Sequence, residues 1–428
     1  MLGLLKNRNY FRFWSAQIIS QLGDGVTRLA IIYLVAMLSK DPLEIGLVIF
    51  AQLLPTAVFG IFFGPLADKY SRKWLMVGSD FYRMTIVLLM IFFHDSVPAL
   101  ITLIVFQGLG TAVFNPARSA SIPDLVGEKN IQQAISLSQG TKAAMDIIGP
   151  SIGGLLLLMN NYTAIFLIDA ATFLLSAFLL LQITLSATIH KHEQPGGEGY
   201  FSSIGSGIKQ VVSMPALRFL LLLLMPVTLV VGALNTNLVA VLTNVFKVSP
   251  AHFGLLEASV GVGAIVGALF IGPYLLKLLR PSTVMLMGTI IVGAWMVIVI
   301  PLDMIRPALG ITPIYLWCLM IGVLNTLINV PLSSLFLGAT PAFFRGRGQA
   351  LLGATANSFQ LIGILAGGWI AGYIGVLNGT ALSGLLLIIA VVFFPLLKGY
   401  KELHAIDPKN KKKPIKATEE KAGLPAAK

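Results

Sequence analysis

The sequence has 428 residues, of which 56% are hydrophobic and only 11% are charged, and its formal net charge is +12. A soluble chain usually carries about 25% charged residues. This composition therefore excludes a soluble protein and predicts an integral membrane protein that crosses the bilayer many times.

Twelve apolar runs of membrane-spanning length follow one another along the chain. About 20 helical residues cross the ~30 Å hydrocarbon core of a bilayer, so each run predicts one transmembrane helix. The predicted fold class is an all-α integral membrane protein with twelve transmembrane helices in two six-helix bundles. The predicted spans are 11–38, 43–65, 74–94, 97–117, 136–158, 162–184, 217–241, 253–276, 282–301, 312–335, 349–373 and 376–397.

Positive charges are distributed unevenly between the two sides that these spans define. The connections on the side of the N-terminus hold 15 Lys and Arg residues, and those on the opposite side hold three. Because short cytoplasmic loops carry an excess of Lys and Arg, we expect both termini to be cytoplasmic. The predicted location is the cell inner (plasma) membrane. The net charge is thus explained without a nucleic-acid partner.

Polar residues in the first span follow one face of the helix. Gln17, Gln21, Asp24 and Arg28 are separated by four, three and four positions, which is helical spacing. Charged side chains in hydrocarbon are costly and usually face the bundle interior or water. This stripe therefore predicts the wall of a polar cavity, with Asp24 near mid-span.

A short polar turn, Gly64–Lys73, joins the second and third spans. Gly64 allows two backbones to approach closely, and Asp68 and Arg72 are four positions apart, a spacing that allows a local ion pair. The turn is interpreted either as a basic loop that sets topology or as a conformational gate.

Similar polar stripes occupy the fourth and fifth spans. The fourth span carries Gln107, Thr111, Asn115 and Arg118 on a similar face, and the fifth carries Ser138, Lys142 and Asp146 at intervals of four. Two readings are open. The polar side chains either join helices to one another, with ionic i,i+4 pairs such as Lys142–Asp146, or line one shared aqueous cavity, which would explain all of the stripes together.

Four other charged residues within the spans are interpreted as structural. Asp80 and Arg83 lie low in the third span, where they could pair with the Gly64–Lys73 turn, Asp169 lies in the sixth span, and Glu257 lies near the outer end of the eighth.

The longest polar connection divides the chain near its middle. The predicted organisation is an N-terminal bundle (1–185), a cytoplasmic linker (186–213), a C-terminal bundle (214–398) and a disordered basic tail (399–428). The tail is a candidate for contact with anionic lipid. His190 and His192 in the linker have no Cys or Asp partners nearby, and the single cysteine, Cys318, cannot form a cluster or an intramolecular disulfide. No metal site and no cofactor are expected.

The second half of the chain repeats features of the first. Gly272-Pro273 followed by Lys277 and Arg280 matches the Gly64 turn at a constant offset of 208 residues, although Leu276 stands where the first copy has Asp68. Such an offset suggests two homologous halves in parallel register. The seventh and tenth spans contribute polar residues at mid-span, namely Asn235, Asn325 and Asn329.

These motifs together resemble the major facilitator superfamily. The Gly64–Lys73 turn is similar to that superfamily's signature cytoplasmic loop, and its weaker copy after the eighth span is also typical. Gly149-Pro150-Ser151-Ile152-Gly153-Gly154 resembles the GPxxGG core of the motif associated with antiporters. The segment Phe114–Arg118 and the start of the chain resemble the branch of macrolide-efflux proteins and enterobactin exporters. Ile104 departs from the arginine that drug/proton antiporters often carry.

The resemblance implies a secondary transporter that works by alternating access, with two bundles rocking about a central site. The polar stripes and these motifs together give two groups of candidate residues. The substrate- and proton-binding group is Gln17, Gln21, Asp24, Arg28, Gln107, Thr111, Asn115, Lys142, Asp146, Asn235, Asn325 and Asn329. The conformational gate is Gly64, Asp68, Arg72, Gly149, Pro150, Gly153, Gly154, Gly272 and Arg280. Asp24 and Asp146 are the candidates for proton exchange, although Arg28 and Lys142 nearby favour their ionised forms.

The predicted function is export of an amphipathic small molecule, drug-like or siderophore-like, by proton-coupled antiport. The expected partners are this substrate, protons and membrane lipid, and the protein is expected to act as a monomer. The alternatives are a carrier of the same fold for a nutrient, an ion or a lysolipid, and a membrane receptor without transport activity. An enzyme is not expected, because no Ser/His/Asp set or phosphate-binding loop is present.

Overall fold

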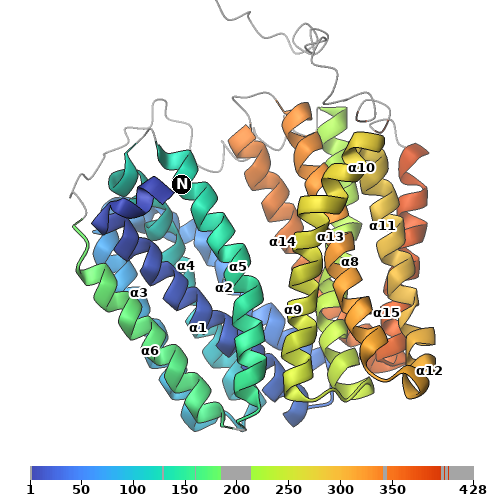
Figure 1. Cartoon of the computed structure of the whole chain (residues 1–428), viewed down its shortest axis with the longest axis horizontal. Helices are drawn as coiled ribbons and strands as arrows, with labels where there is room; N and C mark the ends of the chain where they lie inside the picture. The colour runs from blue at the N-terminus through green and yellow to red at the C-terminus, as the bar shows by residue number, and fades with distance from the viewer. Residues whose placement is uncertain are drawn as a thin grey trace, which may run out of the picture.

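The computed structural model describes residues 2–127, 130–159, 161–184, 214–340, 345–396, 400 and 403. Within these residues the regular structure is entirely helical, and Figure 1 shows two groups of helices side by side. The predicted linker 186–213, with His190 and His192, lies outside the described residues, as does nearly all of the predicted tail 399–428.

The first group consists of six long helices. They are α1 (Arg8–Leu38), α2 (Pro42–Lys69), α3 (Arg72–Phe93), α4 (Val97–Val126), α5 (Ile131–Leu157) and α6 (Tyr162–Leu181). Within this group, which we call the N bundle, α1 packs against α5 and α6, α2 against α4, and α3 against α4 and α6.

The second group, the C bundle, contains several broken or distorted helices. Its elements are α8 (Pro215–Ala240), which continues as the π-helical turn η3 (Val241–Val245); α9 (Pro250–Val266), which continues through η4 (Gly267–Ile271) into α10 (Gly272–Leu278); α11 (Pro281–Val297), α12 (Val299–Leu309), α13 (Thr312–Ala339), α14 (Arg345–Ile374) and α15 (Val376–Val392). Here α8 packs against α14, α9 against α13, and α11 against α13 and α15.

Ten helical segments among the described residues are long and apolar enough to cross a membrane, and the bent pair α11–α12 would be an eleventh. The number twelve remains a prediction, because α5 carries Lys142 and Asp146 and is not among these apolar segments. The ninth span was predicted to end at 301, but the chain bends by 53° and stays helical to Leu309. Pro301 lacks the N–H that would bond to the carbonyl of Val297, which explains a break at this point.

The two bundles share apolar packing only toward the end that lies away from the N-terminus. Of the four buried apolar clusters among the described residues, one combines side chains from both bundles, and the other three each belong to a single bundle. In the shared cluster the rings of Tyr33 of α1 and Phe253 of α9 are tilted by 49°, with 5.4 Å between their centroids. Near the same end, Asn244 donates a hydrogen bond to the carbonyl of Lys40 at 2.9 Å.

The backbones of the two bundles approach each other closely at a pair of glycines. A Cβ added at Gly154 of α5 would collide with the backbone of Gly254 of α9, and the reverse substitution would collide equally. Backbone contact of this kind requires residues without side chains. It places α5 and α9 directly against each other, while α2 packs against α14.

We expect Gly154→Val to push the bundles apart at this end, because its methyl groups have no space against Gly254. Spin labels at Asp95 and Leu309, on exposed positions of the two bundles near this end, should then report a longer mean distance. Gly140→Val on the same helix is the matched control, since its added Cβ meets no atom within 4 Å. An unchanged distance distribution in Gly154→Val would contradict the expectation that the glycine contact keeps the two bundles close at this end.

Candidate functional site

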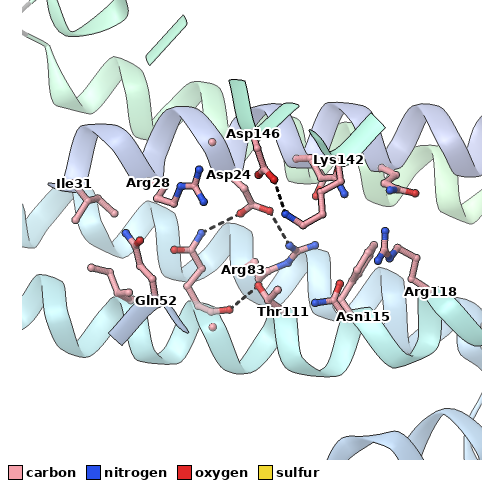
Figure 2. A pocket seen from close by; sticks show the side chains of 18 residues that line it. Asp24, Arg28, Ile31, Gln52, Arg83, Thr111, Asn115, Arg118, Lys142 and Asp146 are labelled. Carbon is pink, nitrogen blue, oxygen red and sulfur yellow. Dashed lines mark hydrogen bonds and ion pairs between the residues drawn. The ribbon is translucent and has the colours of Figure 1, made fainter. Parts of the chain in front are cut away.

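A polar cavity of about 250 Å³ lies inside the N bundle, between α1, α3, α4 and α5 with one residue from α2. Figure 2 shows its charged and polar side chains converging from the surrounding helices. Nine of the twelve residues assigned to substrate and proton binding line it. These are Gln17, Gln21, Asp24, Arg28, Gln107, Thr111, Asn115, Lys142 and Asp146.

The other three assigned residues lie in the C bundle and do not line this cavity. On α13 the side chain of Asn329 donates to the carbonyl of Asn325 at 3.0 Å, and Asn235 is half-buried on α8. The expectation that both bundles contribute to one chamber therefore remains a prediction.

The centre of the cavity wall is an ionic network that joins α1 to α3. The Arg83 guanidinium donates to the Asp24 carboxylate at 3.2 Å and to the Asp80 carboxylate on its other side. Asp24 is 34% exposed, whereas the side chains of Arg83 and Asp80 are 2% and 0% exposed. Asp24 is thus the member of the network that a solute or proton in the cavity can reach.

Further contacts hold Arg83 rigidly behind Asp24. Its guanidinium lies over the rings of Phe114 and Phe173, with 4.7 Å and 4.4 Å to the ring centroids, a cation–π arrangement that is strongest when desolvated. Ser176 donates to Asp80 at 2.7 Å. The interpretation of Arg83 as only structural, close to the Gly64–Lys73 turn, was incomplete, because Arg83 itself lines the cavity.

A second ion pair crosses one turn of α5. Lys142 donates to Asp146 at 2.7 Å, and both side chains are about half exposed. In contrast, Arg28 makes no hydrogen bond or ion pair within 4.0 Å among the described residues, although Asp24 and Glu257 act on it electrostatically. The cavity therefore combines satisfied ion pairs at its centre with guanidinium groups that have no bound carboxylate.

Asp169, also interpreted as structural, is fully buried beneath the cavity wall. Thr172 donates to its Oδ1 at 3.2 Å, and this oxygen lies where a Cβ on Gly23 would be. Asp169 does not line the cavity, and its Oδ2 is buried without a hydrogen-bond partner among the described residues, so its structural role remains a prediction.

The residues assigned to the gate are divided between two environments. Arg72 donates to the Asp124 carboxylate at 2.7 Å and to the carbonyl of Ala120 at 2.8 Å, which ties the start of α3 to the end of α4. The side chains of Gly64 and Asp68 are not among those that the structure describes. On the C bundle Gly272 continues the π-helical segment, and Arg280 precedes α11.

The glycines of α5 make close helix contacts on two sides. A Cβ added at Gly149 would lie about 3 Å from the backbone of Gly25 in α1, and Gly153 packs on Val26. Gly154 faces the other bundle. There, a Cβ added at Gly254 would also lie 3.0 Å from the carbonyl oxygen of Pro150. Helix α5 therefore packs tightly between α1 and α9. The gate role itself remains a prediction.

An all-helical membrane protein with two bundles and an ion-paired polar cavity has the architecture of a solute transporter. The family model "Major Facilitator Superfamily" matches residues 13–357 and, in a second match, residues 220–427. The chain belongs to the major facilitator superfamily and is a transporter of small molecules, not an enzyme.

Curated relatives with similar sequences include efflux proteins. The chain is 28% identical to the MFS-type transporter YfiS of Bacillus subtilis strain 168 over 87% of this chain and 89% of that protein. It is 23% identical to macrolide efflux protein A of Streptococcus pyogenes, over 92% and 97%. It is 28% identical to the enterobactin exporter EntS of Citrobacter koseri, over 93% and 94%. The resemblance to this branch is confirmed.

Solved structures show the same fold at low identity. The crystal structure of the nucleoside transporter NupG superposes with a TM-score of 0.69 at 15% identity, over 90% of this chain and 98% of that one. This similarity confirms the transporter fold.

Proposed function

We propose that this transporter exports an amphipathic small molecule, drug-like or siderophore-like, by alternating access coupled to the entry of protons. The efflux relatives support export. In this proposal the protein lies in the plasma membrane as a monomer, surrounded by lipid, with both termini in the cytoplasm.

The observation that carries the proposal is the charge balance of the network at Asp24. Two carboxylates, Asp24 and Asp80, share one guanidinium, Arg83, so these three groups carry a net charge of −1 when ionised, and the more distant cations Arg28 and Lys142 act to offset it. Desolvation of such charges is costly. One proton on Asp24 would neutralise the network and leave the Arg83–Asp80 pair intact.

This arrangement gives protonation a structural consequence. Asp24 belongs to α1, whereas Asp80 and Arg83 belong to α3. A proton on Asp24 weakens its attraction to Arg83, while the packing of the guanidinium between Phe114 and Phe173 keeps Arg83 in place. We propose that this change alters the position of α1 relative to α3 and so couples proton binding to the exchange between open states.

The contacts between the bundles support a specific conformational state. Because the bundles meet near the end away from the N-terminus, a cytoplasmic N-terminus would make this an inward-facing form with a closed outer end. In the opposite, outward-facing form, the Gly64–Lys73 turn and its copy at Gly272–Arg280 would hold the cytoplasmic end closed.

Transport in proteoliposomes tests the proposal. The full chain is reconstituted, a pH gradient is imposed, and movement of a macrolide, a catecholate chelator and a carboxylate chelator is followed with and without a protonophore. We expect saturable transport against the direction of the proton gradient, and loss of net accumulation when the gradient is collapsed. Transport that is indifferent to the gradient would contradict proton coupling, while absence of transport of every compound would contradict the proposed substrate class.

A further inference from the structure

Arg118 on α4 lines the cavity, and among the side chains that the structure describes no carboxylate forms an ion pair with it. Its guanidinium donates to Ser138 Oγ at 3.3 Å, and its Nε is buried with no hydrogen-bond partner in the part of the chain that the structure describes. The Nε of Arg83 is likewise buried without a partner among the described residues, but Arg83 and Lys142, by comparison, are bound directly to carboxylates. Arg118 is therefore a cavity cation whose hydrogen-bonding capacity is unfilled.

Within the described part of the chain, Arg118 also lacks a compensating negative charge. The charged group that acts on it is a second guanidinium, that of Arg83, which repels it. Arg28 differs, because two carboxylates, Asp24 and Glu257, act on it. A desolvated guanidinium beside another cation is unfavourable until an anion approaches. The electrostatics at Arg118 thus favour an anionic ligand.

The surroundings of Arg118 are suited to an acid group. Gln17 donates to Ser138 at 2.8 Å, and Ser138 in turn accepts from Arg118, so the guanidinium is oriented by neutral polar groups. Asn115 lies beside Arg118 in Figure 2, at the end of the cavity opposite Arg28 and Ile31. A planar guanidinium can bind both oxygens of a carboxylate.

The length of the cavity fits an amphipathic molecule. Its lining residues on α1 run from Gln17 to Ile31, a separation of about 21 Å at 1.5 Å per residue. Ile31 and Ile104 lie at the wall of the cavity but are only 1% and 2% exposed. A molecule with an acid group at Arg118 would extend its less polar body along the cavity toward Ile31.

We infer that Arg118 anchors the acid group of the transported molecule, and that the substrate is an amphipathic organic anion carrying a carboxylate. This inference rests on the proposed export function and assigns the substrate class at the same site. Arg118 was predicted to lie on the polar face of the fourth span but was not assigned to the group of binding residues.

The test compares three fluorescent probes: dansylglycine (anionic), its amide (neutral) and dansylcadaverine (cationic). The first two differ only in the acid or amide group, and the third has a longer alkyl chain as well as the opposite charge. Binding to the full chain in phosphatidylcholine nanodiscs is measured by titration, and transport is measured in proteoliposomes. We expect the wild type to bind dansylglycine at least about tenfold more tightly than the amide. Arg118→Gln should lower the affinity for dansylglycine alone, by about tenfold to a hundredfold. Arg118→Lys should retain part of the preference.

Arg12→Gln is the control, because Arg12 donates to the carbonyl of Gln182 and does not line the cavity. It removes one positive charge and should leave the preference for the anion unchanged. The comparison of acid and amide probes on the wild type needs no variant. The inference can therefore be contradicted even if Arg118→Gln folds poorly.

Three outcomes would overturn the inference: equal affinity of the wild type for acid and amide, tighter binding of the cation, or an equal loss for all probes in Arg118→Gln. Phosphatidylglycerol added to the nanodiscs should not compete, and strong competition would assign the subsite to a lipid phosphate instead. Saturable transport without preference for the anion would overturn only this inference, whereas no transport of any probe would contradict the export function.

Discussion

Replacing Asp24 with asparagine will abolish the dependence of transport on a pH gradient. The amide keeps the size of the side chain and can still accept the hydrogen bond that Arg83 donates to Asp24 at 3.2 Å in the wild type. It cannot take up a proton. Net accumulation in proteoliposomes should fall to the level measured without a gradient. Exchange of substrate across the membrane, which needs no net proton movement, should persist.

The control for this experiment is Asp95→Asn, in the connection between α3 and α4. The Asp95 side chain is 86% exposed and does not line the cavity, so the variant should behave as wild type. If Asp24→Asn still accumulated substrate in response to the gradient, Asp24 would not be the coupling carboxylate. Asp146→Asn would then be the next variant to measure, because Asp146 also lines the cavity.

Of the variants described, Arg83→Gln is expected to lower the free energy of unfolding most. It leaves Asp80, which is 0% exposed, with only the hydrogen bond from Ser176 at 2.7 Å. Removing one partner of a buried ion pair costs about 3–5 kcal/mol, since the remaining charge is buried without compensation. The free energy of unfolding in mixed detergent micelles should fall by this amount, and Arg83→Lys, which keeps the charge but not the planar group, should lose less.

The double variant Arg83→Gln/Asp80→Asn separates charge from packing. It removes both the cation and the carboxylate that would be left alone, so it should regain much of the stability lost in the single variant. Transport should not return, because Asp24 would still lack its guanidinium. Equal stability of the single and double variants would show that lost packing on Phe114 and Phe173, and not buried charge, dominates the effect.

Much of the cavity could be predicted from helical spacing alone. Residues on α1 and α4 recur every three or four positions, and that period places them on one face whatever the tertiary packing. The sequence could not show that Arg83 reaches Asp24, which is 59 positions away. The only local sign was the i,i+3 spacing of Asp80 and Arg83 within an apolar span, and it was interpreted as structural.

The C bundle was less predictable for a different physical reason. Asn235, Asn325 and Asn329 also lie at mid-span, but whether they reach a shared chamber depends on how the two bundles are oriented. Hydrophobic patterning fixes which face of a helix is polar, not the angle between rigid groups of helices. The bend between α11 and α12 was likewise missed, because the residues after Pro301 were taken as a loop.

The backbone contact of Gly154 with Gly254 would act as a fulcrum if the bundles rock. From Gly154 to Ile131, at the far end of α5, the helix extends about 35 Å. A rotation of about 15°, a typical size for rigid-body switching, would move that end by roughly 9 Å, while Lys142, about half as far along, would move by roughly 5 Å. A pivot set this far from the end that holds the N-terminus turns small changes near Asp24 into a wide opening at that end, which is leverage that a centrally placed hinge would lack.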